Sequence, residues 1–249
     1  GLTQFAHDFP KHFFDVGIAE GHAVTMASGL AKQGMLPVVA VYSTFLQRAY
    51  DMMIHDTAIA NLHVVFAVDR AGLVGADGET HHGVFDVSYL RTVPHMSVFA
   101  PASTEELRKT MYHAVYEVEG PVAVRYPRGG NDGYMDCNLE DLVLREGTDA
   151  TLVCYGAMVG EALRAANLLE RQGISLEIVK LWQLAPLDLS KVSASVQKTR
   201  RLIVLEEDVR QGCLGQEILA GLAQENILPE QARLMNLGDG FVTKSEAKR

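Results

Sequence analysis

The sequence has few cysteines and no long hydrophobic run. Its three cysteines, Cys137, Cys154 and Cys213, are odd in number and widely spaced, which suits neither a disulfide framework nor a zinc site. No apolar segment reaches the roughly 18 residues that a membrane-spanning helix needs, and no signal peptide opens the chain. We therefore expect a protein of a reducing cytoplasm, with buried or incidental thiols and no membrane partner.

Positive charge is also scarce. The chain has 22 Lys and Arg against 31 Asp and Glu, a net charge of −9, whereas a nucleic-acid surface draws on clustered basic residues. We therefore expect no nucleic-acid partner. The Gly-x-Gly-x-x-Gly and Walker A patterns are absent as well, which argues against a nucleotide bound by this chain alone.

What the sequence does contain is an alternation of short apolar runs with longer helical patterns. With 249 residues, 48% of them hydrophobic and 21% charged, the chain can form two globular domains. The alternation is typical of α/β proteins, so we predict two consecutive parallel-sheet domains with crossover helices. The predicted strands are 13–18, 37–42, 64–68, 97–100 and 121–126, followed by 151–155, 175–181, 202–205 and 233–237.

Capping signals place helices between these strands. Gly34 suits the left-handed end of the first helix, and Ser103 or Thr104, together with Glu106, predicts a capping box. The predicted helices are 21–32, 45–60 with Ser43 or Thr44 as its cap, one starting at 104, one ending near 172, a short one near 188 and one starting at 214.

Two stretches lack both the helical and the strand period. Residues 71–83 are glycine-rich and polar, and a long loop after a parallel strand commonly serves function. Residues 128–146 change to turn-favouring residues. We therefore predict domains at 1–130 and 148–249, joined by a linker at 131–147.

Glu20 lies at a predicted strand-to-helix turn between apolar neighbours. An acid in the first turn of a helix is commonly just a favourable partner of the helix macrodipole. Alternatively, a carboxyl group in an apolar site has a raised pKa and can share a proton with a ring nitrogen. The local physics alone favours the first interpretation.

Aromatic and basic residues follow three of the predicted strands. Tyr42, Phe45 and Arg48 surround a helix start, although Phe45 could be an ordinary core residue. Arg70 and Arg128 come at the carboxyl edge of the sheet, where guanidinium groups suit bidentate binding of phosphate. Surface ion pairs are an equal alternative for both arginines.

Asp77, His81 and His82 lie in the loop 71–83. Such a cluster could ligate a metal, but adjacent histidines point in different directions and no second cluster completes a coordination shell. We therefore predict no metal site, and we favour general acid–base work for Asp77 and His81.

Five ordered segments spread over the chain carry a family resemblance. They closely resemble the 1-deoxy-D-xylulose-5-phosphate synthase family, and the ten residues from Tyr42 are more specific to it than to transketolases at large. The segments are Asp15-Val16-Gly17-Ile18-Ala19-Glu20, Tyr-Ser-Thr-Phe-Leu-Gln-Arg-Ala-Tyr-Asp at 42–51, Asp69-Arg70-Ala71-Gly72, 75–86 and Arg125-Tyr126-Pro127-Arg128-Gly129.

The resemblance implies a transferase of isoprenoid and thiamine biosynthesis. Such an enzyme condenses pyruvate with glyceraldehyde 3-phosphate and releases carbon dioxide, using thiamine diphosphate and magnesium. The same resemblance makes 1–130 a transketolase pyrimidine-binding domain and 148–249 a transketolase C-terminal domain. It also implies a homodimer in a bacterial cytoplasm.

On the cofactor side, the resemblance gives Glu20 a catalytic role. Glu20 matches the acid that hydrogen-bonds the aminopyrimidine ring and promotes the imino tautomer that deprotonates the thiazolium carbon. Phe45 matches the aromatic packed against that ring, and Tyr42 and Arg48 match residues that line the same pocket.

On the acceptor side, the resemblance implies binding and proton transfer. Arg70 and Arg128 match the pair that holds the phosphate of the acceptor aldehyde, and Tyr42 lies on the substrate side of the pocket. Asp77 and His81 match polar loop residues that handle protons near the reacting carbons.

The resemblance also implies that half of the site is missing from this sequence. The family binds diphosphate and magnesium through a Gly-Asp-Gly motif followed by an asparagine, and both lie in its N-terminal domain. Gly238-Asp239-Gly240 has the same letters, but no asparagine follows it, so we predict a turn there. We expect the N-terminal domain of the same enzyme to be a partner and this chain alone to be inactive.

Two alternatives compete with a fragment of the synthase. The chain could be a separately encoded C-terminal or β subunit of a transketolase or 2-oxoacid dehydrogenase, or a standalone structural or regulatory module. The set of Arg70, Arg128 and His81 favours the synthase.

Overall fold

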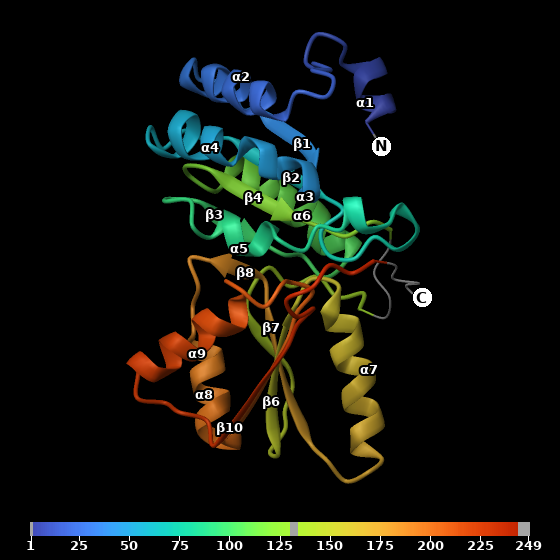
Figure 1. Ribbon diagram of the computed structural model, residues 1–249, viewed down its shortest axis with the longest axis vertical. Helices are drawn as coiled ribbons and strands as arrows, with labels where there is room; N and C mark the ends of the chain where they lie inside the picture. Colours follow the sequence, from blue (N-terminus) through green and yellow to red (C-terminus); the bar gives the residue numbers. More distant parts are fainter. Residues whose placement is uncertain (1, 130–133, 244–249) are drawn as a thin grey trace.

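The strands of the protein form two five-stranded sheets. The computed structural model describes residues 2–129 and 134–243. The first sheet has the order β1-β2-β4-β3-β8, and the second has the order β10-β9-β6-β7-β5. Figure 1 shows the two sheets stacked along the long axis, each with its own helices. The predicted α/β class with two sheets is confirmed.

The first sheet is built around a buried central strand. β1 (Val38–Tyr42), β2 (Val65–Asp69) and β4 (Val122–Arg125) run parallel, as does β3 (Ser97–Phe99). Phe66 of β2 shares one core cluster with helix α2 (Glu20–Lys32), whereas Val65 shares another with helix α6 (Thr104–Tyr116). Because successive strand residues point to opposite faces, α2 and α6 cover opposite faces of the sheet.

The second sheet follows the same rule. Val153 packs in the cluster that contains the helices α8 and α9, whereas Leu152 packs in the cluster that contains α7. Figure 1 accordingly shows α7 on one side of this sheet and α8 and α9 on the other. The elements are β5 (Leu142–Arg145), β6 (Ala150–Tyr155), α7 (Met158–Glu170), β7 (Leu176–Leu181), α8 (Ser190–Thr199), β9 (Arg201–Leu205), α9 (Leu214–Gln224) and β10 (Gln231–Met235).

The predicted strand at 13–18 was wrong. Its apolar side chains have no neighbouring strand to bury them, since Phe14 is 59% exposed and Ile18 is 92% exposed. Asp15 accepts a hydrogen bond from the backbone of Gly17, whose φ of 65° is left-handed. This turn ends any extended run. A short helix that was not predicted, α1 (Thr3–Asp8), precedes it and contains no buried residue.

The predicted helix at 45–60 is present but irregular. It consists of α3 (Ser43–Leu46), a 3-10 turn (Gln47–Ala49), α4 (Tyr50–Met52) and a π-helical segment (Met53–Ala58). Neither predicted residue caps it: Ser43 is buried inside α3, and Thr44 donates to the backbone oxygen of Thr80 at 3.2 Å. Packing against other elements thus overrides the local capping preference.

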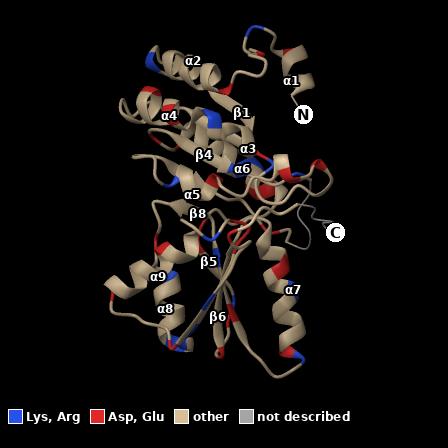
Figure 2. Cartoon of the chain, in the orientation of Figure 1, with Lys and Arg blue, Asp and Glu red and all other residues tan. Residues whose placement is uncertain are grey.

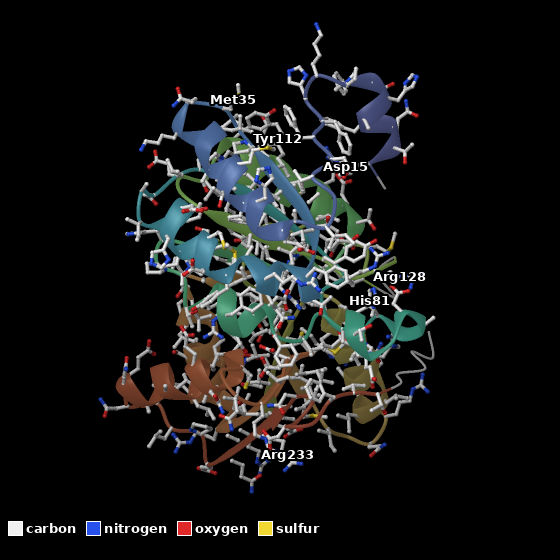
Figure 3. All side chains as sticks on the ribbon, turned by 45° about the horizontal axis from the view of Figure 1, so that its top comes forward. Asp15, Met35, His81, Tyr112, Arg128 and Arg233 are labelled. Carbon is white, nitrogen blue, oxygen red and sulfur yellow. The ribbon has the colours of Figure 1, made fainter. Side chains whose placement is uncertain are left out.

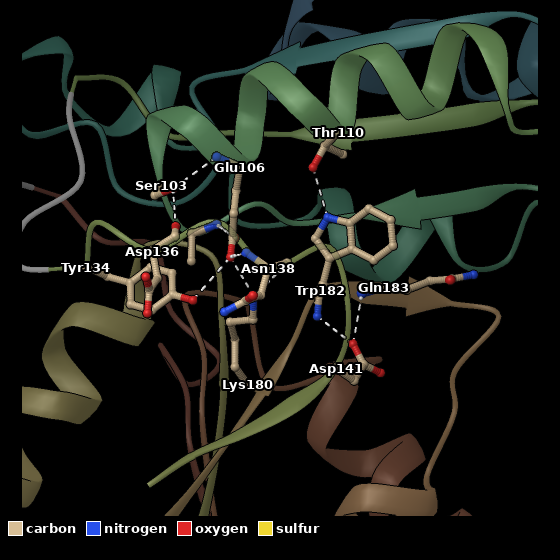
Figure 4. Close-up of polar contacts among 11 residues, drawn as sticks. Ser103, Glu106, Thr110, Tyr134, Asp136, Asn138, Asp141, Lys180, Trp182 and Gln183 are labelled. Atoms are coloured by element: carbon tan, nitrogen blue, oxygen red, sulfur yellow. Dashed lines mark hydrogen bonds and ion pairs between the residues drawn. The ribbon is translucent and has the colours of Figure 1, made fainter.

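Only part of the predicted capping box forms at the start of α6. Ser103 accepts from the backbone of Glu106 at 3.0 Å, as predicted, but Glu106 does not bond back to Ser103. Its carboxylate instead accepts from the backbone of Ala102 at 2.7 Å and from Lys180 of β7 at 2.5 Å. Glu106 and Lys180 are both fully buried. Figure 4 shows that this pair connects α6, which covers the first sheet, with β7 of the second sheet.

Two strands depart from the predicted division of the chain. β5 lies inside the predicted linker 131–147 and pairs antiparallel with β7. β8 (Gln183–Ala185) follows β7 of the second sheet, yet it pairs antiparallel with β3 of the first. Trp182 lies between β7 and β8, and its indole N–H donates to Thr110 of α6 at 2.9 Å. The two sheets are therefore not purely parallel, and residues 131–133 of the predicted linker lie outside the described residues.

Other expectations can be compared directly. The cysteines are free, Cys154 and Cys213 are buried and Cys137 is partly buried, which agrees with the expectation of buried or incidental thiols. Residues 238 and 239 form a turn, with Asp239 paired to Arg210 at 3.0 Å. Within the described ranges, no helix is both long enough and apolar enough to cross a membrane.

Candidate active site

The candidate residues gather at one edge of the first sheet. Tyr42 ends β1 directly beside Asp69, its register partner at the end of β2. Arg70 follows β2, and Arg128 comes shortly after the end of β4. Because parallel strands end at the same edge, these side chains are brought together. Figure 3 labels His81 and Arg128 at this edge.

Glu20 is the first residue of α2, and its carboxylate is largely enclosed. Its side chain is 13% exposed, and Oε1 accepts a hydrogen bond from Arg48 Nη1 at 2.9 Å. The positive end of the helix dipole also favours a carboxylate at this position. The site is therefore not the purely apolar one considered from the sequence, because a guanidinium group lies against the acid.

Aromatic rings form the wall beside this acid. Phe45 stacks on Tyr42, with ring centroids 5.8 Å apart and planes 21° apart. Arg48 lies over Phe45 at 5.0 Å from the ring centroid, and His81 meets the same ring edge-on at 5.3 Å. Phe45 is thus only partly buried and contacts three of the other candidates, so it is not an ordinary core residue.

Two arginines converge on Asp77. Arg70 Nε donates to Asp77 Oδ2 at 3.2 Å, and Arg128 Nη1 donates to Asp77 Oδ1. Arg70 also lies 3.6 Å from the Tyr42 ring centroid and donates to Asp69 at 2.8 Å. Burial pushes the pKa of Asp77 upward, but the two arginines together hold that pKa below its ordinary value. Asp77 is therefore an ionised bridge between two cations.

The backbone of Arg70 is unusual for a non-glycine residue. Its φ of 60° lies in the left-handed region, and its N–H donates to the side chain of Asp69 at 2.7 Å. Strained backbone of this kind is concentrated at functional sites. No local pattern in the sequence indicated this conformation.

The loop 71–83 holds its two histidines apart, as expected from their adjacency. His81 hydrogen-bonds the Thr80 hydroxyl at 2.9 Å and lies against the Phe45 ring, whereas His82 is buried and accepts from the backbone of Val74 at 3.1 Å. Burial lowers the pKa of His82. His82 therefore supports the loop, whereas the side chain of His81 stays partly exposed.

The base of this loop is closed by a backbone clip. Gly72 N donates to Gly83 O at 2.7 Å, and Gly83 N donates to Gly72 O at 2.9 Å. A methyl group on Gly83 would lie 2.5 Å from Ser43 Oγ, so a glycine is needed there. Sequence reasoning missed Ser43, Thr44 and Thr80 as supports of the loop, because their partners are distant in the chain.

A buried cluster of charged residues connects two units of the protein, the first sheet with its helices and the second sheet with its helices. Arg125 donates to both oxygens of Asp86, at 2.9 and 3.2 Å, and lies 5.6 Å from the Tyr155 ring centroid. Asp208, also fully buried, accepts from Ser88 at 3.1 Å. Burial, and then the charge of Asp86, raise the pKa of Asp208 to about 8. Figure 2 shows acidic positions on the strand ends and loops between the two sheets.

All eight candidate residues form one continuous array of contacts. It runs from Glu20 through Arg48, Phe45, Tyr42, Arg70 and Asp77 to Arg128, with His81 on Phe45. The array offers an enclosed carboxylate, a flat aromatic wall, two convergent guanidinium groups and a partly exposed imidazole. Such a set can bind a planar heterocycle at one end and a phosphate at the other.

Comparison with known protein families decides the relationship. The family described as "Transketolase, pyrimidine binding domain" matches residues 1–131. The chain belongs to the transketolase family. A second description, "Transketolase, C-terminal domain", matches residues 140–240 of this transketolase-family chain.

Similar proteins carry a more specific name. The chain is 47% identical, over 97% of its length, to a 1-deoxy-D-xylulose-5-phosphate synthase of Chlorobium luteolum, and 45% identical over 97% to one of Pelotomaculum thermopropionicum. It spans 39% of the length of each of these relatives. A solved structure described as "Split gene transketolase, inactive beta4 tetramer" is similar with a TM-score of 0.83 at 30% identity, over 96% of this transketolase-family chain and 79% of that one.

Proposed function

We propose that the chain is the pyrimidine-binding and C-terminal part of a 1-deoxy-D-xylulose-5-phosphate synthase. Such an enzyme condenses pyruvate with glyceraldehyde 3-phosphate and releases carbon dioxide. The observation that supports this most is the continuous array from Glu20 to Arg128, in a chain 47% identical to a relative of that name. The lower identity of 30% to the split transketolase makes a separate transketolase subunit the weaker candidate.

Glu20 and the aromatic wall suit the aminopyrimidine of thiamine diphosphate. The enclosed carboxylate can hydrogen-bond a ring nitrogen, and Phe45, with Tyr42 stacked behind it, offers a flat face for the ring. When bound, this cofactor supplies a carbon nucleophile. Arg48 fixes Oε1 of Glu20, so we assign to Oε2 the task of holding the proton shared with the ring.

The acceptor end suits a phosphorylated aldehyde. Arg70 and Arg128 already converge on the carboxylate of Asp77, and a phosphate group offers them more acceptor oxygens and more charge. We infer that the phosphate of the substrate competes with Asp77 for these guanidinium groups. Asp77 and His81 then lie near the substrate as proton-handling groups.

Magnesium and the diphosphate need residues from elsewhere. The described part of the chain holds no group of three His, Cys, Asp or Glu side chains that could bind a metal ion. We assign magnesium and the diphosphate mainly to the N-terminal domain of the same enzyme. The division into domains at 1–130 and 148–249, a homodimeric assembly and a bacterial cytoplasmic location complete the proposal.

Cofactor titration tests the division of the site. The purified chain is titrated with thiamine diphosphate and magnesium by calorimetry, alone and together with the N-terminal region of a synthase. We expect binding only in the mixture. Tight binding by the chain alone would show that the site is complete without a partner.

Substitutions test the two ends of the array in the reconstituted enzyme. Glu20→Gln should lower kcat by at least about a hundredfold, because it removes the proton-sharing carboxylate. Arg128→Ala should raise KM for glyceraldehyde 3-phosphate much more than KM for unphosphorylated glyceraldehyde, whereas Arg108→Ala, an exposed ion-pair arginine on α6, should change neither. Unaltered carbon dioxide release by Glu20→Gln would refute the assignment.

A further inference from the structure

The segment that follows β9 reaches from the second sheet to the site loop. Val209 donates its backbone N–H to the oxygen of Val84 at 3.1 Å, directly beyond the loop 71–83. Ser88 of α5 (Asp86–Leu90) donates to Asp208 at 3.1 Å. Arg91 donates to the backbone oxygen of Gly212 at 3.3 Å. The two units are therefore bonded at the point where the loop rejoins the first sheet.

Glu207 of this segment lies against the clip that closes the loop. A methyl group on Gly72 would lie 2.3 Å from Glu207 Oε2, so the carboxylate touches the glycine backbone, whose φ of 79° is left-handed. Burial raises the pKa of Glu207, while Arg125 and the backbone amide of Leu73 favour its charged form. The carboxylate thus meets the loop at its first two residues after Ala71.

The loop is also held by contacts from the first sheet and its helices: Thr44 donates to the oxygen of Thr80, and Asp77 accepts from Arg70 and Arg128. Between Gly72 and Gly83 the loop contains two 3-10 turns, Gly75–Asp77 and Glu79–His81. Asp77 and His81, the two candidates for proton transfer, are the last residues of these turns. These turns hold themselves weakly, because short 3-10 segments have poor hydrogen-bond geometry. The position of the loop base therefore contributes, together with these contacts, to where Asp77 and His81 lie.

We propose that Glu207 is a positioning residue, whose carboxylate fixes the base of the loop 71–83 and thereby sets the places of Asp77 and His81. The second unit then acts on the site of the first through one side chain. The catalytic consequence rests on the proposed function, whereas the effect on the loop does not.

Hydrogen exchange tests the positioning role in the 249-residue chain itself. Glu207→Ala should speed exchange of the amides of 73–82 about tenfold, because the loop base loses its anchor. Glu207→Gln keeps the acceptor and the size, and it should stay within about twofold of the wild type. Glu230→Ala removes an exposed ion-pair partner in the same unit and should change nothing in the loop.

The reference for local loosening is β6, in the core of the second sheet. Equal exchange in the loop of the wild type and of Glu207→Ala overturns the proposal. So does a rise of the same size in β6, since that marks a general loss of stability. Glu207→Asp keeps a carboxylate but places it farther from Gly72, so amide exchange in the loop should rise about fivefold. If Glu207→Ala does not fold, Glu207→Asp is the variant that tests the proposal.

A kinetic measurement in the reconstituted enzyme adds a second readout. Glu207→Ala should lower kcat/KM for the acceptor about tenfold and shift the pH profile, while the Kd for thiamine diphosphate stays within about twofold. Equal losses in cofactor binding and in turnover overturn the positioning role. An inactive wild-type reconstitution counts against the proposed function and leaves the exchange result standing.

Discussion

The buried carboxyl of Asp208 makes the stability of the fold depend on pH in an unusual direction. Burial and the neighbouring Asp86 raise its pKa from 3.8 to about 8, against the opposing charge of Arg125. Because the pKa is higher in the folded state, the contribution of this group is fully present below the unfolded pKa. It is lost as the pH rises through the folded value.

The size of the effect follows from the shift. Each pKa unit corresponds to about 1.4 kcal/mol. Between about pH 5 and about pH 8 the unfolded carboxyl is ionised, while the folded one still holds much of its proton, so the free energy of unfolding should fall by about 3.5 kcal/mol from this group. The other charged groups facing it are Glu206 beyond β9 and Arg91.

Asp208→Asn isolates this contribution. The amide keeps an oxygen for the backbone of Val209, which donates to Asp208 at 2.9 Å, and it stays neutral at every pH. Urea unfolding of both proteins at about pH 5 and about pH 8 should therefore show the variant gaining about 3.5 kcal/mol on the wild type with rising pH.

The exposed carboxylate of Asp239 provides the control. Asp239 pairs with Arg210 at the surface, so Asp239→Asn should leave the pH dependence unchanged. A stability difference between Asp208→Asn and the wild type that stays constant with pH would refute the reasoning. It would mean that Asp208 is ionised in the fold and held by Ser88 and Arg125.

Further predictions concern single stabilising features, each measured by urea unfolding. Lys180→Met leaves the buried carboxylate of Glu106 without its cationic partner and should lower the free energy of unfolding by about 3–5 kcal/mol. The double variant with Glu106→Gln should recover most of this loss, and a failure to recover it would contradict the explanation. Ser103→Ala removes the cap of α6 and should cost about 1 kcal/mol, and no loss would mean that the cap is dispensable. Gly29→Ala, in the interior of α2 with open space around it, should stabilise by about 0.5–1 kcal/mol. Gly34→Ala, at φ 84°, should destabilise by a similar amount, and the same sign for both would contradict the explanation.

Where burial and local sequence agree, the sequence predicted the fold well. β2 is apolar and buried from Val65 to Val68, and α2 ends at Lys32, shortly before the left-handed Gly34 that the sequence indicated. The strand expected at 13–18 failed because an apolar pattern needs a partner surface, and there the turn at Asp15 and Gly17 prevails. β8 was missed because pairing with β3 depends on contacts far apart in the chain.

The candidate site was predictable as a set of residues but not as an arrangement. Strand ends and loop position placed Arg70, Arg128 and Asp77 at one edge. That both arginines converge on Asp77 requires the left-handed backbone at Arg70 and the path of the loop. Local sequence patterns predict neither feature. They also do not predict the contact of Glu207 with the loop, because Glu207 follows β9 of the second sheet.

The crossing of β8 has a consequence for cutting the chain. Because this strand hydrogen-bonds to β3, cleavage of the chain within 131–147 should give two polypeptides that stay bound to each other. They should migrate as one particle under native conditions and separate only on denaturation. Expressing residues 1–130 alone would leave β3 with bare backbone donors and acceptors along one side, the kind of edge that recruits foreign strands. A soluble N-terminal piece would therefore need either 183–185 supplied in trans or a charged substitution on β3.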